Sequence, residues 1–214
     1  LAALATQTDA LPDLIFVGGS LVKAGTTRQA IEKVRGVCDR PIVLFPGSIL
    51  QVDGSADALF FLSLISGRNP EMLIGNHVVA APMIRQSGLE VLPTGYLLVD
   101  GGQATAVSYI SNTFPIPRDK NDIAACTAMA GEMLGLRNLY MDAGSGALHA
   151  IEPAMISAVR EHTSLPIIVG GGIKTEHDAI NACQAGADVV VVGNAIEANP
   201  NLLSNIVGAV RAGA

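Results

Sequence analysis

Two glycine-rich turns near the end of the chain carry the clearest chemical signal in the sequence. One reads Gly170-Gly171-Gly172-Ile173 and the other reads Val192-Gly193-Asn194-Ala195, and each directly follows a short apolar run. Because glycine has no Cβ, its backbone N–H can approach an anion closely. Two such turns after successive strands predict a phosphate-binding site. Tight turns without a bound anion are the alternative that these residues leave open.

An acidic side chain stands at the start of a third turn. Asp142 ends an apolar run and is followed by Ala143-Gly144-Ser145-Gly146. A carboxylate beside a flexible turn that accepts anions could serve as the general base for a bound hydroxyl. A capping or ion-paired aspartate is the alternative, and the residues alone do not decide between the two.

Serine hydroxyls follow two earlier apolar runs. In Gly18-Gly19-Ser20 the hydroxyl could contact phosphate or join the hydrated shell of Mg2+, although helix capping explains a serine here equally well. In Phe45-Pro46-Gly47-Ser48 ordinary turn chemistry is favoured. The four histidines lack the spacing of a zinc site.

Short apolar runs alternate with helix-like segments and must position these turns. The runs are Asp13–Val17, Pro41–Phe45, Ala58–Leu62, Leu89–Thr94, Asn138–Asp142, Pro166–Val169 and Asp188–Val192. Several are continuous Val, Ile and Leu stretches, as strands of a parallel sheet buried on both faces require. The helix-like segments include Thr27–Cys38, Asp119–Leu134, Glu152–His162, Thr175–Ala185 and Asn199–Val210. Thr175, with Asp178 three residues later, predicts a helix N-cap. The alternation predicts an α/β fold.

Either an open doubly wound sheet or a closed (β/α)8 barrel fits this alternation. The segment Leu1–Thr8 reads as the end of a helix, and the first strand of a barrel would precede it. We therefore expect one modified TIM barrel domain over residues 1–214 that lacks its N-terminal strand. The apolar runs then supply barrel strands two to eight, and the loops after strands seven and eight commonly bind phosphate. The long connection Leu98–Arg118 falls on the same face, and its length suggests a function.

Composition excludes several classes of protein. The chain has 214 residues, of which 50% are hydrophobic and 15% charged, so it is not disordered. The formal charge is −6, and no lysine or arginine run points to nucleic acid. The most apolar stretches are far shorter than the roughly 20 residues that span a bilayer. Three widely spaced cysteines and the lack of a secretory signal predict a cytoplasmic protein.

Five motifs resemble those of one known family, in the same order along the chain. They are Gly18-Gly19-Ser20, Pro93-Thr94-Gly95-Tyr96, Pro117-Arg118-Asp119-Lys120, Tyr140–Gly146 and Val169–Ile173. The resemblance is to geranylgeranylglyceryl phosphate synthase, the prenyltransferase family that includes heptaprenylglyceryl phosphate synthase. Ile74-Gly75-Asn76-His77 resembles the branch that many archaea share with some bacteria of the Bacteroidetes type.

The resemblance implies a modified TIM barrel that transfers a polyprenyl group from its diphosphate to the C3 hydroxyl of sn-glycerol 1-phosphate. Diphosphate is released, Mg2+ is required, and the product contains the first ether bond of archaeal-type lipids. Asp142 takes the place of the glutamate that usually serves as base, and Ser20 that of a Mg2+ ligand. The residues implied for glycerol phosphate binding are Tyr140, Met141, Asp142, Ala143, Gly144, Ser145, Gly146, Gly171, Gly172, Gly193 and Asn194.

Two departures from the family pattern accompany this resemblance. Asp142 is one methylene shorter than the usual glutamate. The first strand of the family ends in an Ile-Asp-Pro-Asp-Lys-like motif that supplies a Mg2+ aspartate and a phosphate-facing lysine, and neither is present in this sequence. The prenyl tail also needs an apolar groove, for which we expect the small residues Ala58, Gly95 and Ala104 to leave room.

Two other functions fit the same turns. A sugar-phosphate isomerase or lyase would share the phosphate site. It needs an acid and a base on opposite strands, but this chain has Asp142 on one strand and Ser20, which is not a matching partner, on the other. A phosphate-binding barrel that has lost catalysis, and that serves as an assembly subunit, is the second. In the prenyltransferase interpretation, we further expect a homo-oligomer that works transiently near the membrane.

Overall fold

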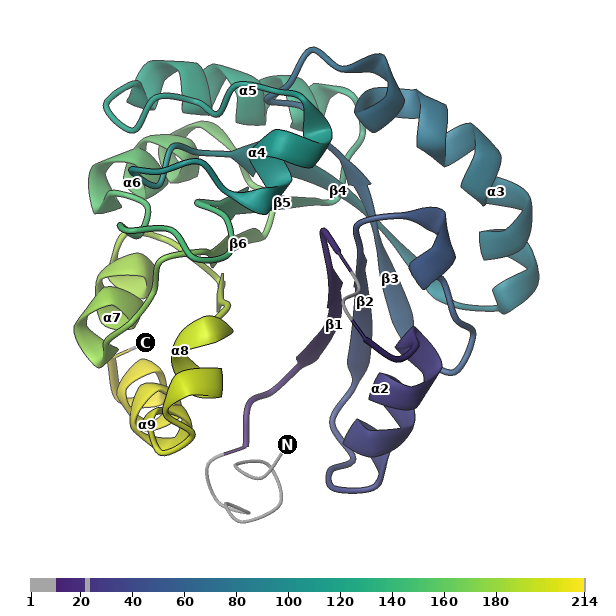
Figure 1. Ribbon diagram of the computed structural model, residues 1–214. Helices are drawn as coiled ribbons and strands as arrows, with labels where there is room; N and C mark the ends of the chain where they lie inside the picture. Colours follow the sequence, from purple (N-terminus) through teal and green to yellow (C-terminus); the bar gives the residue numbers. More distant parts are fainter. Residues whose placement is uncertain (1–10, 22–23, 214) are drawn as a thin grey trace.

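Seven strands form one parallel sheet in the computed structural model, which describes residues 11–21 and 24–213 (Figure 1). The strands are β1 (Ile15–Gly19), β2 (Ile42–Pro46), β3 (Ala58–Ser63), β4 (Glu90–Leu98), β5 (Asn138–Asp142), β6 (Ile167–Gly170) and β7 (Val189–Val190). Each strand pairs with its neighbour in the sequence, so the sheet order follows the chain order. Every strand overlaps one of the predicted runs, which confirms the α/β prediction.

Two strands differ from the predicted length by more than one residue. β4 continues beyond Thr94 to Leu98, because its last residues stay paired with Tyr140–Asp142 of β5. β7 is shorter than the predicted run and contains Val189–Val190. The extension of β4 carries Tyr96 into the middle of the sheet, where it becomes part of the site described below.

Helices pack around the sheet, most of them on its outer face (Figure 1). They are α2 (Thr27–Arg35), α3 (Asn76–Ser87), α4 (Ala106–Ser111), α5 (Asn121–Met133), α6 (Pro153–His162), α7 (Glu176–Gln184), α8 (Asn194–Ala198) and α9 (Leu202–Gly213), with the 3-10 helix η2 (Ile49–Gln51) and the π-helix η3 (Glu71–Gly75). The Thr175 N-cap is confirmed, since its hydroxyl accepts from the Asp178 N–H at 3.1 Å. The predicted helix end at Leu1–Thr8 lies outside the described residues.

Three helices are additional to the predicted segments. α3 escapes prediction because apolar Val78 and Val79 are exposed and Pro82 lies inside the helix, so its buried face does not stand out in the sequence. α4 lies within the long connection Leu98–Arg118. The third, α8, begins directly at the second glycine-rich turn. All three border the cavities of the candidate site.

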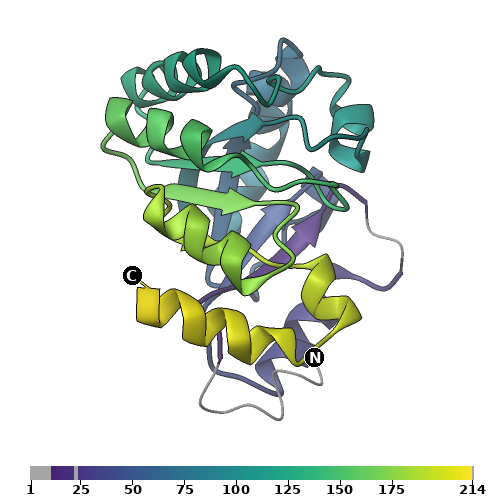
Figure 2. The same cartoon turned by 90° about the vertical axis from the view of Figure 1, so that its left-hand side faces the viewer.

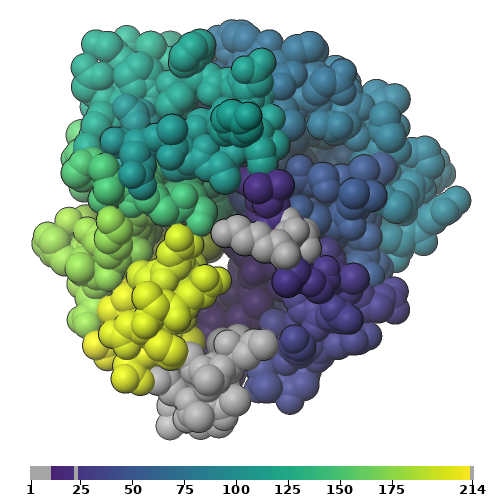
Figure 3. Space-filling view, viewed as in Figure 1, coloured from purple at the N-terminus to yellow at the C-terminus, as the bar shows by residue number. Residues whose placement is uncertain are grey.

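The sheet curves like a barrel that is open on one side. β1 and β7 stand at the two ends of the strand order, and a cavity of about 1480 Å³ lies between them. Figure 3 shows the molecule hollowed between the yellow C-terminal helices and the purple β1 segment. Among the described residues, the sheet therefore has seven parallel strands and one open seam, as in a (β/α) barrel that is not closed. Figure 2 shows α5, α6 and α7 stacked side by side, with α9 next to α7.

Alternation along β5 separates two packing layers. Leu139 and Met141 face outward and are fully buried against the helices, in the cluster that contains Ile156. Tyr140 faces inward, into the cluster that contains Tyr96, and Asp142 points the same way. Because successive side chains of a strand point to opposite faces, this register alone sends the carboxylate into the barrel interior.

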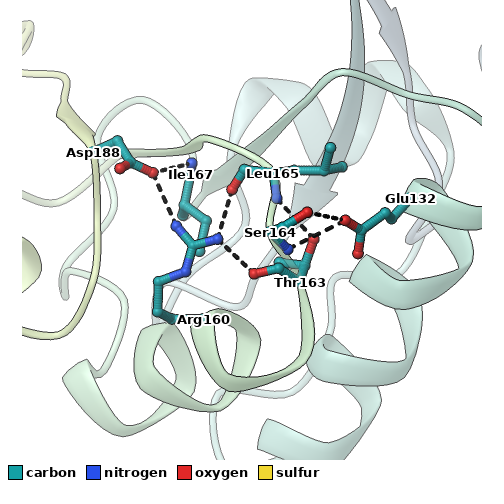
Figure 4. A network of polar contacts seen from close by, with 7 residues as sticks. All are labelled: Glu132, Arg160, Thr163, Ser164, Leu165, Ile167 and Asp188. Atoms are coloured by element: carbon teal, nitrogen blue, oxygen red, sulfur yellow. Dashed lines mark hydrogen bonds and ion pairs between the residues drawn. The ribbon is translucent and has the colours of Figure 1, made fainter.

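A polar network ties α6 to the opposite, amino-terminal edge of the sheet (Figure 4). The Arg160 guanidinium donates to the carbonyls of Thr163 and Leu165 at 2.6 and 2.8 Å, and it pairs with Asp188 at 3.0 Å. The same Asp188 oxygen accepts the Ile167 N–H at 2.7 Å. Arg160 therefore satisfies the loop carbonyls between α6 and β6 and connects them to the residue before β7.

Glu132 extends this network from the end of α5. Its carboxylate accepts from the hydroxyl and the N–H of Ser164, at 2.6 and 3.2 Å (Figure 4). The hydrogen bond from the Ser164 side chain is the main cause that lowers the pKa of Glu132. The contacts at this edge are thus structural, and they are remote from the turns that carry the chemistry.

Replacing Arg160 should destabilise the fold without affecting the site. Arg160→Ala removes three charge-assisted hydrogen bonds, but the ion pair is partly exposed, so we expect a loss of about 1–2 kcal/mol in the free energy of unfolding. Urea denaturation measures this loss. Arg137→Ala, at an exposed arginine, is the control and should change stability by less than about 0.5 kcal/mol. Equal midpoints for the two variants would contradict the role of the network.

Candidate active site

Asp142 lies at the carboxyl end of β5 with its side chain buried in the barrel. Only 8% of the residue is exposed. One carboxylate oxygen accepts the Gly144 N–H at 2.7 Å, and the other accepts the hydroxyl of Tyr96 from β4. Burial raises the pKa of Asp142, and the hydrogen bonds from Tyr96 and Gly144 oppose that rise. The arrangement holds one orientation of the carboxylate and keeps it available to take up a proton.

Aromatic rings form the wall beside this carboxylate. The rings of Tyr96 and Tyr140 are stacked with centroids 5.6 Å apart, and Phe45 lies 4.8 Å from Tyr140. Burial, together with the nearby charge of Asp142, raises the pKa of both tyrosines well above the usual value. Both therefore remain neutral phenols, and Tyr96 can act as a hydrogen-bond donor to the carboxylate at every physiological pH.

The turn after β6 packs directly against the turn after β5. Gly171 and Gly172 have φ values of +78° and +72°. A Cβ on Gly171 would lie 2.6 Å from a carboxylate oxygen of Asp142 and 2.7 Å from the Gly144 N–H nitrogen. A Cβ on Gly172 would lie 2.3 Å from the carbonyl oxygen of His149. Only glycine fits at these two positions.

A hydrogen bond joins the turn after β5 to the start of α8. The Ser145 hydroxyl donates to the Asn194 side-chain oxygen at 2.9 Å. Three turns, after β5, β6 and β7, therefore border the same large cavity. The predicted residues on its wall are Tyr140, Asp142, Gly144, Ser145, Gly146, Gly171, Gly172, Gly193 and Asn194.

Two predicted binding residues do not reach the cavity with their side chains. Met141 and Ala143 are 0% and 1% exposed, and both belong to the outer cluster between the sheet and the helices. Met141 points outward because it alternates with Tyr140 and Asp142 along β5. The N–H of Ala143 already donates to the Gly170 carbonyl at 3.1 Å.

A second, apolar cavity of about 210 Å³ meets the first at Asp142. It runs from Tyr96 and Phe45 towards the space between β3 and α3. Its apolar wall includes Leu59, Phe61, Met72, Ala80, Ile84 and Ile110. The carboxylate thus stands where this apolar cavity meets the part of the larger cavity that the three glycine turns border, called the glycine-lined cavity below. The rest of the larger cavity has an apolar wall, which includes Val190, Leu202 and Ile206.

The expectation that Ala58, Gly95 and Ala104 form the groove is wrong. None of the three lines either cavity. Ala58 is buried in the inner cluster, and a Cβ on Gly95 would lie 2.8 Å from Ile65. Gly95 is therefore small because β4 and the helical layer pack closely there.

The predicted Mg2+ ligand, Ser20, lies among the described residues. Within 11–21 and 24–213, no group of three or more His, Cys, Asp or Glu side chains is placed to hold a metal ion. Ser20 follows β1 and lines both cavities, so its hydroxyl could supply one oxygen ligand. Protein sites for Mg2+ commonly add one or two carboxylates to waters and substrate phosphates.

The sequence did not single out the partner of Asp142. Tyr96 stands in the second of the five family motifs, but its side-chain contact arises from the pairing of β4 with β5. No sequence spacing predicts this pair, because 45 residues separate its members along the chain.

A parallel (β/α) barrel with glycine turns after its last strands is typical of phosphate-binding barrel enzymes. The PcrB family profile matches residues 2–211. Geranylgeranylglyceryl phosphate synthase of Chitinophaga pinensis is 56% identical to this chain, and the match covers 100% of this chain and 85% of that protein. The protein of the same name from Korarchaeum cryptofilum is 43% identical, and the match covers 91% of this chain and 80% of that protein. The crystal structure of (S)-3-O-geranylgeranylglyceryl phosphate synthase from Thermoplasma acidophilum, in complex with sn-glycerol-1-phosphate, has a TM-score of 0.91 at 33% identity, covering 99% of this chain and 86% of that one. The chain belongs to the PcrB family.

No helix among the described residues is long and apolar enough to cross a membrane.

The buried carboxylate should lower stability at high pH. Burial raises the pKa of Asp142 in the folded state. The free energy of unfolding therefore decreases as the pH rises from the usual carboxyl pKa through this raised pKa. Asp142→Asn cannot ionise, so we expect it to melt at a higher temperature than the parent at pH 8. This gain should shrink as the pH falls towards 4. Asp119→Asn, at an exposed carboxylate, is the control. Melting curves that differ equally at both pH values would contradict the assignment.

Proposed function

We propose that this protein transfers a polyprenyl group from its diphosphate to the C3 hydroxyl of sn-glycerol 1-phosphate, which forms an ether bond and releases diphosphate. The observation that carries the proposal is the position of Asp142, at the junction of a glycine-lined cavity and an apolar cavity. One substrate would be a small phosphate ester and the other a long hydrocarbon. Membership of the PcrB family and the named relatives support the same reaction.

The glycine-lined cavity suits the phosphate ester. Gly171, Gly172 and Gly193 bring backbone close to an anion, and the Ser145–Asn194 hydrogen bond holds two of the turns together. A phosphate anchored there would direct the glycerol hydroxyl towards Asp142. Such anchoring replaces a random encounter with a fixed approach.

Asp142 is the proposed general base. A carboxylate has roughly four acceptor sites, so the bonds from Tyr96 and Gly144 leave room for a substrate hydroxyl. As the glycerol oxygen forms its bond to the allylic carbon, its proton passes to the carboxylate. The bond between that carbon and the diphosphate oxygen breaks, and diphosphate leaves with the electron pair.

The apolar cavity suits the prenyl tail. Its wall carries the aromatic rings of Phe45 and Tyr96 near Asp142 and aliphatic side chains farther along. Aromatic faces stabilise a nearby cation, so positive charge that develops on the allylic carbon is stabilised at this point. The hydrocarbon beyond it would be removed from water between β3 and α3.

Three further features belong to this proposal. Mg2+ would accompany the diphosphate, and Ser20 is the ligand that the described chain would supply. The protein would act in the cytoplasm and meet its lipid substrate transiently at a membrane. It would assemble as a homo-oligomer.

An assay of product formation tests the function directly. The protein is mixed with sn-glycerol 1-phosphate, Mg2+ and prenyl diphosphates of several lengths, and prenylglyceryl phosphate is sought by mass spectrometry. We expect product, and we expect Asp142→Asn to lower its rate by about 10²–10⁴ because the base is lost. Binding of glycerol phosphate without any product would favour an inactive phosphate-binding barrel. Turnover of a sugar phosphate instead would favour the isomerase or lyase.

Narrowing the apolar cavity should shorten the tail that the protein accepts. Ala80 lies on its α3 wall and is 8% exposed, so Ala80→Trp would fill part of the space. We expect the preferred prenyl diphosphate to become shorter, as read from the product masses in a mixture of substrates. Val79→Trp, on the exposed face of the same helix, is the matched control. An unchanged length preference in Ala80→Trp would show that the tail lies elsewhere.

A further inference from the structure

Gln51 is a buried polar side chain that the chemistry above does not use. It is the last residue of η2 and is 3% exposed. Its side-chain oxygen accepts the N–H groups of Gly19 and Gly47, both at 3.3 Å, and its side-chain nitrogen donates to the Gly19 carbonyl at 2.7 Å. A buried amide is costly unless its hydrogen bonds are made, and all three of these bonds go to the backbone of two turns.

These two turns follow neighbouring strands and lie in close contact. One is the Gly18–Ser20 turn after β1, and the other is the Pro46–Ser48 turn after β2. A Cβ on Gly47 would lie 2.4 Å from the Gly19 carbonyl oxygen. The backbones are therefore too close for a side chain between them, and the Gln51 amide joins them from the side.

Both turns face the reaction site. Gly19, Ser20, Gly47 and Ser48 line the apolar cavity, whose wall also includes Asp142. In the proposed function the tail fills the hydrocarbon part of this cavity, and the glycerol hydroxyl approaches at Asp142. The diphosphate must then lie at the polar end of the cavity wall, where Ser20 and Ser48 stand.

We propose that Gln51 is a positioning residue, which holds the two serine-bearing turns as one rigid face for the diphosphate of the prenyl substrate. This inference rests on the proposed function. Glutamine suits the role because one side chain supplies both an acceptor and a donor. Leucine here would leave two N–H groups and one carbonyl unpaired, and glutamate would place a carboxylate oxygen against the Gly19 carbonyl.

The test compares Gln51→Leu and Gln51→Glu with Leu50→Ala. Leu50 belongs to the same short helix, but it is 90% exposed and serves as the matched control. For Gln51→Leu we expect the KM for prenyl diphosphate to rise about tenfold or more, while the KM for glycerol phosphate stays nearly constant. Amide hydrogen exchange, followed by NMR, should become faster at Gly19 and Gly47. Gln51→Glu should raise the same KM at least as much, because it turns a donor into a carboxylate oxygen against the Gly19 carbonyl and adds negative charge near the diphosphate. It replaces Gln51→Leu if the latter does not fold.

If Gln51 only stabilised the fold, the two KM values and the hydrogen exchange would change in a different pattern. Equal loss of affinity for both substrates, in proportion to a lower melting temperature, would overturn the inference. Unchanged exchange at Gly19 and Gly47 would also overturn it. If the parent protein makes no ether product, the proposed function fails, but the role of Gln51 can still be tested. The binding of inorganic pyrophosphate is then measured for the parent and for the variant. Weaker binding by the variant supports the role of Gln51, and equal binding overturns it.

Discussion

A carboxylate removed from water must receive hydrogen bonds from the protein, and this requirement at Asp142 organises the centre of the structure. The two donors come from different places, Tyr96 on β4 and the N–H of Gly144 in the next turn. Gly171 must then be glycine, because any Cβ would touch both the carboxylate and the Gly144 nitrogen. One satisfied charge thus determines how β4, β5 and the turn after β6 fit together.

The two cavities that meet at this carboxylate have different linings beside it. The larger one lies at the open seam between β1 and β7 and is bordered by glycine turns, where backbone groups come to the surface. The smaller one is enclosed by aromatic and aliphatic side chains that β3 and α3 supply. A reaction that joins a phosphate ester to a hydrocarbon needs both environments within reach of one base.

Much of this arrangement could be predicted, and the failures share a cause. Continuous apolar runs located all seven strands, and Thr175 located the start of α7. The sequence pattern did not predict α3, because exposed valines interrupt the regular spacing of its buried residues. The groove was misplaced because a small residue such as Gly95 signals close packing as readily as open space. Burial and contact depend on neighbours that a local pattern does not contain.

The sequence by itself determined the α/β class, the positions of the strands and of the three glycine turns, and the family. These properties depend on local patterns, since periodicity sets the strands and the absence of a Cβ sets the turns. Only the tertiary structure decided that Tyr96 meets Asp142, that Met141 points away from the site, and that Gln51 connects two turns. Each of these depends on strand register, which brings together groups that are distant along the chain.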